Sequence, residues 1–202
     1  MTTQGLTGFR YKEKDRLAYN HADSHPDTLG LNVLRELRDV EDWNTVHDRI
    51  DELVPIPETR RLNEYTSMAE SEVRRAFPNL KYDGSLQNIY DLYQPLQGTL
   101  KPYMDGKLMF MPDASDFIHN SGFCEWAYVA NLDSAKYEIW KGQQTKPDPD
   151  NRYGQETDRM GYYPCQKIKE YDLVCIPINS HWVGKKHFEN GTSIPSEKCF
   201  FP

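Results

Sequence analysis

Apolar and polar positions alternate near the N-terminus with the two-residue period that is typical of β-strands. Phe9 and Tyr11 share one face of the first run, and Leu17 and Tyr19 share one face of the second. The charged residues 12–15 between the two runs are a turn signal. The start of the chain is therefore predicted to form a β-hairpin.

The pattern becomes helical after the first proline of the chain. Leu31, Leu34 and Leu37 lie on one stripe of a first predicted helix. Further amphipathic helices are predicted over residues 41–53 and 58–77, and a shorter helix begins at Ser85. Each of these three segments is followed by proline, which cannot continue a helix. The middle of the chain is therefore predicted to be a block of helices.

Strand-like runs return from about Leu108. Residues 123–132 and 136–141 alternate aromatic or aliphatic with polar side chains, and the short link between them predicts a second hairpin. A last strand is predicted over residues 173–176. The intervening segment 142–161 is polar and rich in Pro, Asp and Gln, which predicts a long exposed loop of the kind that is mobile or functional.

A hairpin, a block of helices and then strands, without β-α-β alternation, is typical of an α+β fold. We predict a mainly antiparallel sheet with a block of amphipathic helices packed on it. At 202 residues, with 13 Tyr and 4 Trp to fill a core, the chain is expected to form a single domain over residues 1–202.

Charge and composition narrow the class of protein further. The net charge of −7 weighs against nucleic acid as the main partner. No apolar run is long enough to span a membrane and the N-terminus has no signal-peptide pattern, so we expect a cytoplasmic protein without membrane contact. The cysteines form no C-x-x-C pair, which predicts free, mostly buried thiols and no zinc site: Cys124, Cys165, Cys175 and Cys199. No cofactor motif is present.

The densest polar cluster follows the predicted N-terminal hairpin and precedes the first helix. Three interpretations of it are open. His21, Asp23 and His25 alternate and could hold a metal ion, although the sequence offers no fourth ligand and we expect no metal. Alternatively, Asp23 orients His21 or His25 as a general base. In the third, structural interpretation, Asn20 and Asp23 only satisfy backbone groups at the turn.

A second cluster lies on the strand predicted over residues 123–131. Glu125 and Asn131 would share one face of this strand and lie at the two ends of an otherwise apolar row. A buried Glu125 could carry a proton, whereas an exposed one would be an ordinary surface carboxylate. Cys124 has no activating base nearby in the sequence, so a packed thiol is expected there.

Both clusters resemble part of a known family. The run Tyr19-Asn20-His21-Ala22-Asp23-Ser24, together with Phe123-Cys124-Glu125-Trp126-Ala127-Tyr128, is similar to an uncharacterised family of bacterial, phage and large-virus proteins that carries a Tyr-Asn-His-x-Asp-Ser motif. That family has an aromatic residue at the place of His25, which favours the other polar residues of the motif as the site. The layout also resembles N-terminal-nucleophile hydrolases, but the N-terminal cysteine of that class is absent.

Two hypotheses of function follow. In the first, the protein binds or hydrolyses a polar small molecule at the end of the N-terminal hairpin, with His21, Asp23 and Glu125 as catalytic residues. Asn20, Ser24 and Asn131 would then bind the ligand. In the second, the protein is a non-enzymatic phage or prophage factor that binds a host protein through its acidic, aromatic-rich surface and the 142–161 loop.

Overall fold

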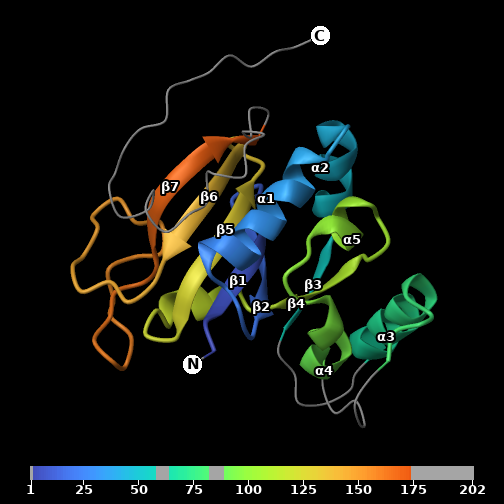
Figure 1. The fold of residues 1–202 in the computed structure, drawn as a ribbon, viewed down its shortest axis with the longest axis horizontal. Helices are drawn as coiled ribbons and strands as arrows, with labels where there is room; N and C mark the ends of the chain where they lie inside the picture. The colour runs from blue at the N-terminus through green and yellow to red at the C-terminus, as the bar shows by residue number, and fades with distance from the viewer. Residues whose placement is uncertain (1, 58–63, 82–88, 174–202) are drawn as a thin grey trace.

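A five-stranded sheet is the centre of the computed structural model, which describes residues 2–57, 64–81 and 89–173 (Figure 1). Its strands are β1 (Gln4–Tyr11), β2 (Lys14–Asn20), β5 (Cys124–Asn131), β6 (Lys136–Lys141) and β7 (Gln166–Asp172). They lie in the order β2-β1-β5-β6-β7, and every pair is antiparallel except β1 with β5. With the helices described below, this sheet confirms the predicted α+β fold and its mainly antiparallel character.

Two tight hairpins build this sheet. The turn between β1 and β2 consists of Lys12 and Glu13, both with positive φ, 53° and 60°, as the twist of a two-residue hairpin requires. The carboxylate of Asp133, in the β5–β6 turn, accepts hydrogen bonds from both of their backbone amides at 2.6 and 2.9 Å. The predicted hairpins are therefore present, and their turns are joined to each other.

A second, two-stranded sheet was not predicted. It pairs β3 (Val54–Pro57) with β4 (Phe110–Asp113) in parallel. The prolines of β3 were interpreted only as a helix stop, but proline is compatible with a short edge strand. The buried carboxylate of Glu72 accepts hydrogen bonds from the amides of Met109 and Phe110, at 2.9 and 3.2 Å, and so fixes the start of β4.

Most helices lie between the two hairpins in the sequence, as predicted. They are α1 (Leu31–Arg38), α2 (Trp43–Asp51), α3 (Glu64–Ala76), α4 (Ile89–Tyr93) and α5 (Lys101–Met104), with a π-helical turn at Pro26–Gly30 and 3-10 turns at Gln94–Leu96 and Ser115–His119. Asp42 caps α2 by accepting from the amide of Asn44. The predicted starts of the third and fourth helices lie outside the described residues. Within the described ranges, no helix has both the length and the apolar character that a membrane crossing requires.

The helices cover one face of the sheet. Phe9, Tyr128 and Tyr137 point to this face and are buried in one cluster with residues of α1 and α2. The two tyrosine rings are stacked with their centroids 6.3 Å apart. Their hydroxyls donate to the carbonyl oxygens of Ser24 and Gly30, at 2.9 and 2.8 Å. The segment between β2 and α1 is therefore attached to the middle of the sheet.

The opposite face carries a smaller apolar cluster that includes Leu6, Leu17, Val129 and Trp140. It is covered by the Ser115–His119 turn and by residues 142–165, which we call the covering loop (Figure 1). The loop predicted over 142–161 is therefore present, but it also packs on the sheet. Most of its residues are exposed, but Asn151 is buried and donates to the carbonyl oxygen of Cys165 at 3.0 Å.

The C-terminal end of the sheet also differs from the prediction. The structure has β7 at Gln166–Asp172, where no strand was predicted. Its residues are mostly charged or polar and half-exposed, because β7 is an edge strand, so it lacks the apolar alternation used for the prediction. Of the strand predicted over 173–176, only Leu173 lies in the described part of the chain.

Gly8 is expected to be essential to the first hairpin. A Cβ on Gly8 would lie 2.0 Å from the carbonyl oxygen of Arg16 and 2.8 Å from the Cα of Leu17, both of which are backbone atoms of β2. Gly8→Ala should therefore lower the free energy of unfolding by about 3 kcal/mol or more, measured by urea denaturation. The comparison is Gly154→Ala, where nothing lies within 4 Å of the added Cβ and the positive φ of 87° alone should cost about 1–2 kcal/mol, so it measures backbone strain without a clash. Equal, small effects of the two variants would contradict this account.

Candidate functional site

The polar cluster at the end of β2 is held mainly by hydrogen bonds to backbone and to its own side chains. We call residues 20–24 the hairpin-end cluster. Asn20 is buried, and its amide nitrogen donates to the carbonyl oxygen of Ala22 at 2.5 Å and to Oγ of Ser24 at 2.8 Å. Ser24 is fully buried, and its backbone amide donates to the carbonyl oxygen of Thr3. These two predicted ligand-binding residues form a compact structural turn.

Asp23 has a backbone role in the same turn. It adopts a φ of 56°, a left-handed conformation that aspartate tolerates better than most residues. Its carbonyl oxygen accepts hydrogen bonds from the amide of Leu29 and the hydroxyl of Thr28. The side chain of Asp23 is exposed, and the side chain of His25 bonds Thr3 at 2.7 Å. Among the described residues, no three His, Cys, Asp or Glu side chains form a group that could hold a metal ion.

His21, like Asp23, is an exposed member of the cluster. Its backbone amide donates to Oε1 of Gln97 at 2.9 Å, which fixes the position of the residue. Its ring Nδ1 lies 3.1 Å from the hydroxyl of Tyr19. The described hydrogen bonds of His21 are with Tyr19 and Gln97, and none of them is with β5.

The two predicted residues of β5 lie at opposite ends of that strand. Gly5 of β1 pairs with Asn20, and Arg10 of β1 pairs with Asn131. Five residues of extended strand separate these pairs, roughly 17 Å at about 3.4 Å per residue. Asn131 therefore lies far from the hairpin-end cluster. Glu125 lies at the near end and is half-buried, and no hydrogen bond or ion pair of the described residues joins it to His21 or Asp23.

A cleft opens beside Tyr19, along the edge strand β2. Its volume is about 730 Å³, within the range of small-molecule sites. The described lining residues come from β2, β3, α4, β4 and the turn that follows β4: Tyr19, Pro57, Tyr90, Asp113, Ala114, Ser115, Asp116, Phe117 and Asn120. The cleft thus adjoins the hairpin-end cluster through Tyr19.

Aromatic rings and aspartates give this cleft its chemistry. The ring of Tyr19 meets Phe117 and Tyr90 edge to face, with centroids 5.3 and 6.4 Å away. Burial raises the pKa of Tyr19, so its hydroxyl stays protonated near neutral pH. Asp116 is exposed on the wall of the cleft, next to Phe117. The lining thus combines flat apolar surfaces with a carboxylate and a phenol hydroxyl.

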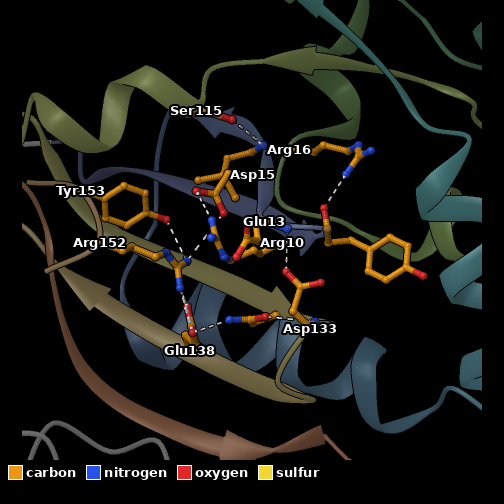
Figure 2. A network of polar contacts seen from close by, with 12 residues as sticks. Arg10, Glu13, Asp15, Arg16, Ser115, Asp133, Glu138, Arg152 and Tyr153 are labelled. Carbon is orange, nitrogen blue, oxygen red and sulfur yellow. Dashed lines mark hydrogen bonds and ion pairs between the residues drawn. The ribbon is translucent and has the colours of Figure 1, made fainter. Parts of the chain in front are cut away.

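Hydrogen bonds fix the turn on which the cleft is built. Oδ1 of Asp113 accepts from the amide and the hydroxyl of Ser115, at 3.0 and 2.6 Å. Oγ of Ser115 in turn accepts from the amide of Leu17 at 3.1 Å (Figure 2). The hydroxyl of Ser115 donates to Asp113 and accepts from Leu17, so this residue holds the turn against β2. Asp113 and Ser115 are therefore supports of the site.

The cleft residues were missed in the sequence, although a signal was present. The stretch 113–116 reads Asp-Ala-Ser-Asp directly after the apolar end of β4. Polar residues at the end of a strand were the criterion that selected the hairpin-end cluster, and this stretch meets it as well. The proximity of Tyr19, Tyr90 and Asp116 could not be derived, because it depends on how β2, α4 and β4 pack together.

A second group of polar side chains lies under the covering loop and is shown in Figure 2. This ionic cluster consists of Arg10, Asp15, Asn131, Glu138 and Arg152. Glu138 is only 2% exposed, and Nη1 of Arg152 donates to both of its carboxylate oxygens, at 2.9 and 2.6 Å. Asn131 also donates to Glu138, at 2.8 Å. Asn131 therefore belongs to this cluster rather than to the hairpin-end cluster.

Arg152 connects the covering loop to the sheet. Its guanidinium lies over the ring of Trp140, 4.4 Å from the centroid, and 3.7 Å from Asp15. Burial acts to lower the pKa of Arg152, but Tyr153, Glu138 and Asp15 outweigh it and raise that pKa. Arg152 therefore stays charged, and its ion pairs with Glu138 and Asp15 hold the middle of the covering loop against the sheet.

The cysteines are packed thiols where the structure describes them. Cys124 and Cys165 are both free and fully buried. Burial, reinforced by the neighbouring Cys165, raises the pKa of the Cys124 thiol well above its ordinary value. Cys124 and Cys165 are therefore free, buried thiols as predicted, while Cys175 and Cys199 lie outside the described residues.

Comparison with known proteins found no match for this chain, whether among family models, curated proteins or solved structures. The chemistry of the site therefore rests on the side chains described above. Of these, Tyr19 belongs to both polar regions, since its ring lines the cleft and its hydroxyl contacts His21 of the hairpin-end cluster.

The ionic cluster predicts a large stability effect at Arg152. Arg152→Met leaves the buried carboxylate of Glu138 without its charged partner, and breaking a buried ion pair in this way costs about 3–5 kcal/mol. Chemical denaturation of the purified variant would measure this loss. The control is Arg74→Met, which removes the exposed pair with Glu70 and should cost less than about 1 kcal/mol. A loss at Arg152 no larger than the loss at Arg74 would contradict the assignment.

Proposed function

We propose that this protein binds a polar small molecule in the cleft beside Tyr19, with His21 at its rim. The observation that carries this proposal is the 730 Å³ cleft next to the hairpin-end cluster. Tyr19 joins the two, because its ring lines the cleft and its hydroxyl lies 3.1 Å from Nδ1 of His21. A cytoplasmic location is part of the proposal, and the free thiols of Cys124 and Cys165 support it.

The described lining favours a neutral or positively charged ligand. The charged residues among the described lining residues are Asp113 and Asp116. Carboxylates attract cations and accept hydrogen bonds from hydroxyl or amino groups, and they repel anions. The rings of Tyr19, Tyr90 and Phe117 offer apolar surface for the body of the ligand and cation–π contact for a positive charge. We therefore expect a ring-sized ligand with hydroxyl or amino groups.

A hydrolytic reaction is a further part of this hypothesis. His21 is exposed and its ring contacts the hydroxyl of Tyr19, a residue that lines the cleft, which supports a role for His21 as general base there. Asp23 and Glu125 have no described contact with His21, so His21 with Tyr19 is the pair on which a reaction would depend. The resemblance to N-terminal-nucleophile hydrolases stays a prediction.

The alternative function, binding to a host protein, is supported by one exposed apolar site. Phe123 and Met160 are 53% and 56% exposed. The sulfur of Met160 lies close to Gly122, next to Phe123, so the covering loop brings the two side chains into the same region. This site is small, and we therefore rank the cleft first. Phe123→Ser with Met160→Ser should leave ligand binding in the cleft unchanged.

Binding can be tested by NMR with three sugars that share a ring and differ in charge. D-glucosamine, D-glucose and D-glucuronate are titrated into ¹⁵N-labelled protein within a wider screen of polar metabolites. Binding in the cleft should shift the amide signals of Tyr19, Asp116 and Phe117, with the cationic sugar bound most tightly. Asp116→Asn should weaken glucosamine binding about threefold, the scale of an exposed ion pair. Asp39→Asn, an exposed aspartate at the end of α1, is the matched control.

Two results would overturn the proposal. One is a screen in which no metabolite shifts the amides of the cleft. The other is tighter binding of glucuronate than of glucosamine, because the carboxylates of Asp113 and Asp116 should repel an anionic sugar.

A further inference from the structure

A small chamber lies next to the cleft, and the two share a wall. The chamber has room for about one water molecule, with a volume of about 10 Å³. Tyr19 and Tyr90 line both the cleft and the chamber. Their rings meet edge to face at 89°, so this pair of side chains forms the partition between the two spaces.

The chamber contains one buried hydroxyl without a protein partner. Thr7 lies in the middle of β1, is 1% exposed, and lines the chamber. Its Oγ1 has no hydrogen-bond partner among the protein atoms of the described structure. A buried hydroxyl in this condition is unfavourable by about 1–3 kcal/mol until something binds it, which is why most buried polar groups in proteins have a partner.

Three other polar atoms among the described lining of the chamber are bonded elsewhere. The hydroxyl of Tyr93 donates to the carbonyl oxygen of Phe110 at 2.7 Å. The hydroxyl of Thr99 donates to Glu36 at 2.6 Å. Oε1 of Gln97 accepts from the amide of His21 at 2.9 Å. Thr7 is thus a fully buried, unpartnered group of the chamber that can bind an incoming atom.

We infer that the chamber is the inner end of the ligand site and takes one uncharged hydroxyl of the ligand, which bonds to Thr7. This inference rests on the proposed function, because it requires the body of the ligand to lie in the cleft. A charged group is disfavoured, since the described lining residues of the chamber include no charged side chain and a buried charge would lack a counter-ion. A hydroxyl both donates and accepts, as does Thr7, and it has the size of the water molecule that the chamber can hold.

The ligand class becomes narrower as a result. The outer cleft favours a neutral or cationic ring beside Asp116, and the chamber requires a hydroxyl, which enters when the contacting rings of Tyr19 and Tyr90 move apart. A hydroxylated ring of the sugar or amino-sugar class combines both features. Simple amines without hydroxyls would occupy the outer cleft alone.

The test compares two amines of similar ring size on variants of Thr7. D-glucosamine carries hydroxyls and an ammonium group, whereas cyclohexylamine carries the ammonium group alone. Thr7→Val keeps the shape of the side chain and removes the hydroxyl, so it should weaken glucosamine binding about tenfold and change cyclohexylamine binding less than twofold. Thr7→Ser keeps the hydroxyl and should bind glucosamine nearly as the wild type does. Affinities are measured by NMR titration.

A second measurement separates binding from a structural role. In the absence of ligand, Thr7→Val should melt at the same temperature as the wild type or higher, because it removes an unpaired buried hydroxyl. A clearly lower melting temperature would show that the hydroxyl supports the fold, and would overturn the inference. Equal glucosamine affinity in Thr7→Val and the wild type would overturn it too.

The inference and the proposed function fail in different ways. One outcome is that cyclohexylamine or a metabolite binds in the cleft while the affinity for glucosamine is the same in Thr7→Val as in the wild type. In that case the inference is wrong and the proposed function stands. If no compound shifts the amides of Tyr19, Asp116 and Phe117, the proposed function is wrong and the inference falls with it.

Discussion

The anchoring of residues 24–30 by two buried tyrosines is the constraint on which the candidate site depends. Tyr128 and Tyr137 come from the second hairpin, and their hydroxyls bond the backbone of Ser24 and Gly30. There is no room for a larger residue at Gly30, since an added Cβ would lie 2.6 Å from the ring of Tyr128. Buried hydroxyls that are fully bonded define one geometry in a low-dielectric core. The turn that presents His21 is therefore set by residues more than one hundred positions away.

The two faces of the sheet are covered in different ways. Helices with apolar stripes cover the tyrosine face, as is usual for this fold class. The other face is covered by a loop whose polar sequence could not pack there by apolar burial alone. Arg152 makes that packing possible, because its planar guanidinium pairs with the carboxylate of Glu138 and lies over the ring of Trp140. Ion pairing thus replaces part of an apolar layer.

Local patterns were sufficient for the fold class but not for the site. Alternation and turn residues predicted both hairpins, and three-four spacing predicted α1 and α2. The strands β3 and β7 were missed, because one contains two prolines and the other is a polar edge strand. The hairpin-end cluster was found as a polar run, but Asn131, which was predicted to bind the same ligand, bonds Glu138 at the other end of β5. Glu138 comes from β6, and Arg152, which bonds Glu138, comes from the covering loop, so strand pairing and the loop bring this group together.

The parallel pairing of β1 with β5 has a consequence for biosynthesis. More than one hundred residues separate the end of β1 at Tyr11 from the start of β5 at Cys124. The first hairpin leaves the ribosome well before its partner strand exists, and contacts of such long range slow the folding of a domain. Until β5 arrives, β1 offers an unpaired edge to any other extended chain. Nascent chains of this protein are therefore expected to need a chaperone until residue 124 and the hairpin that follows have emerged.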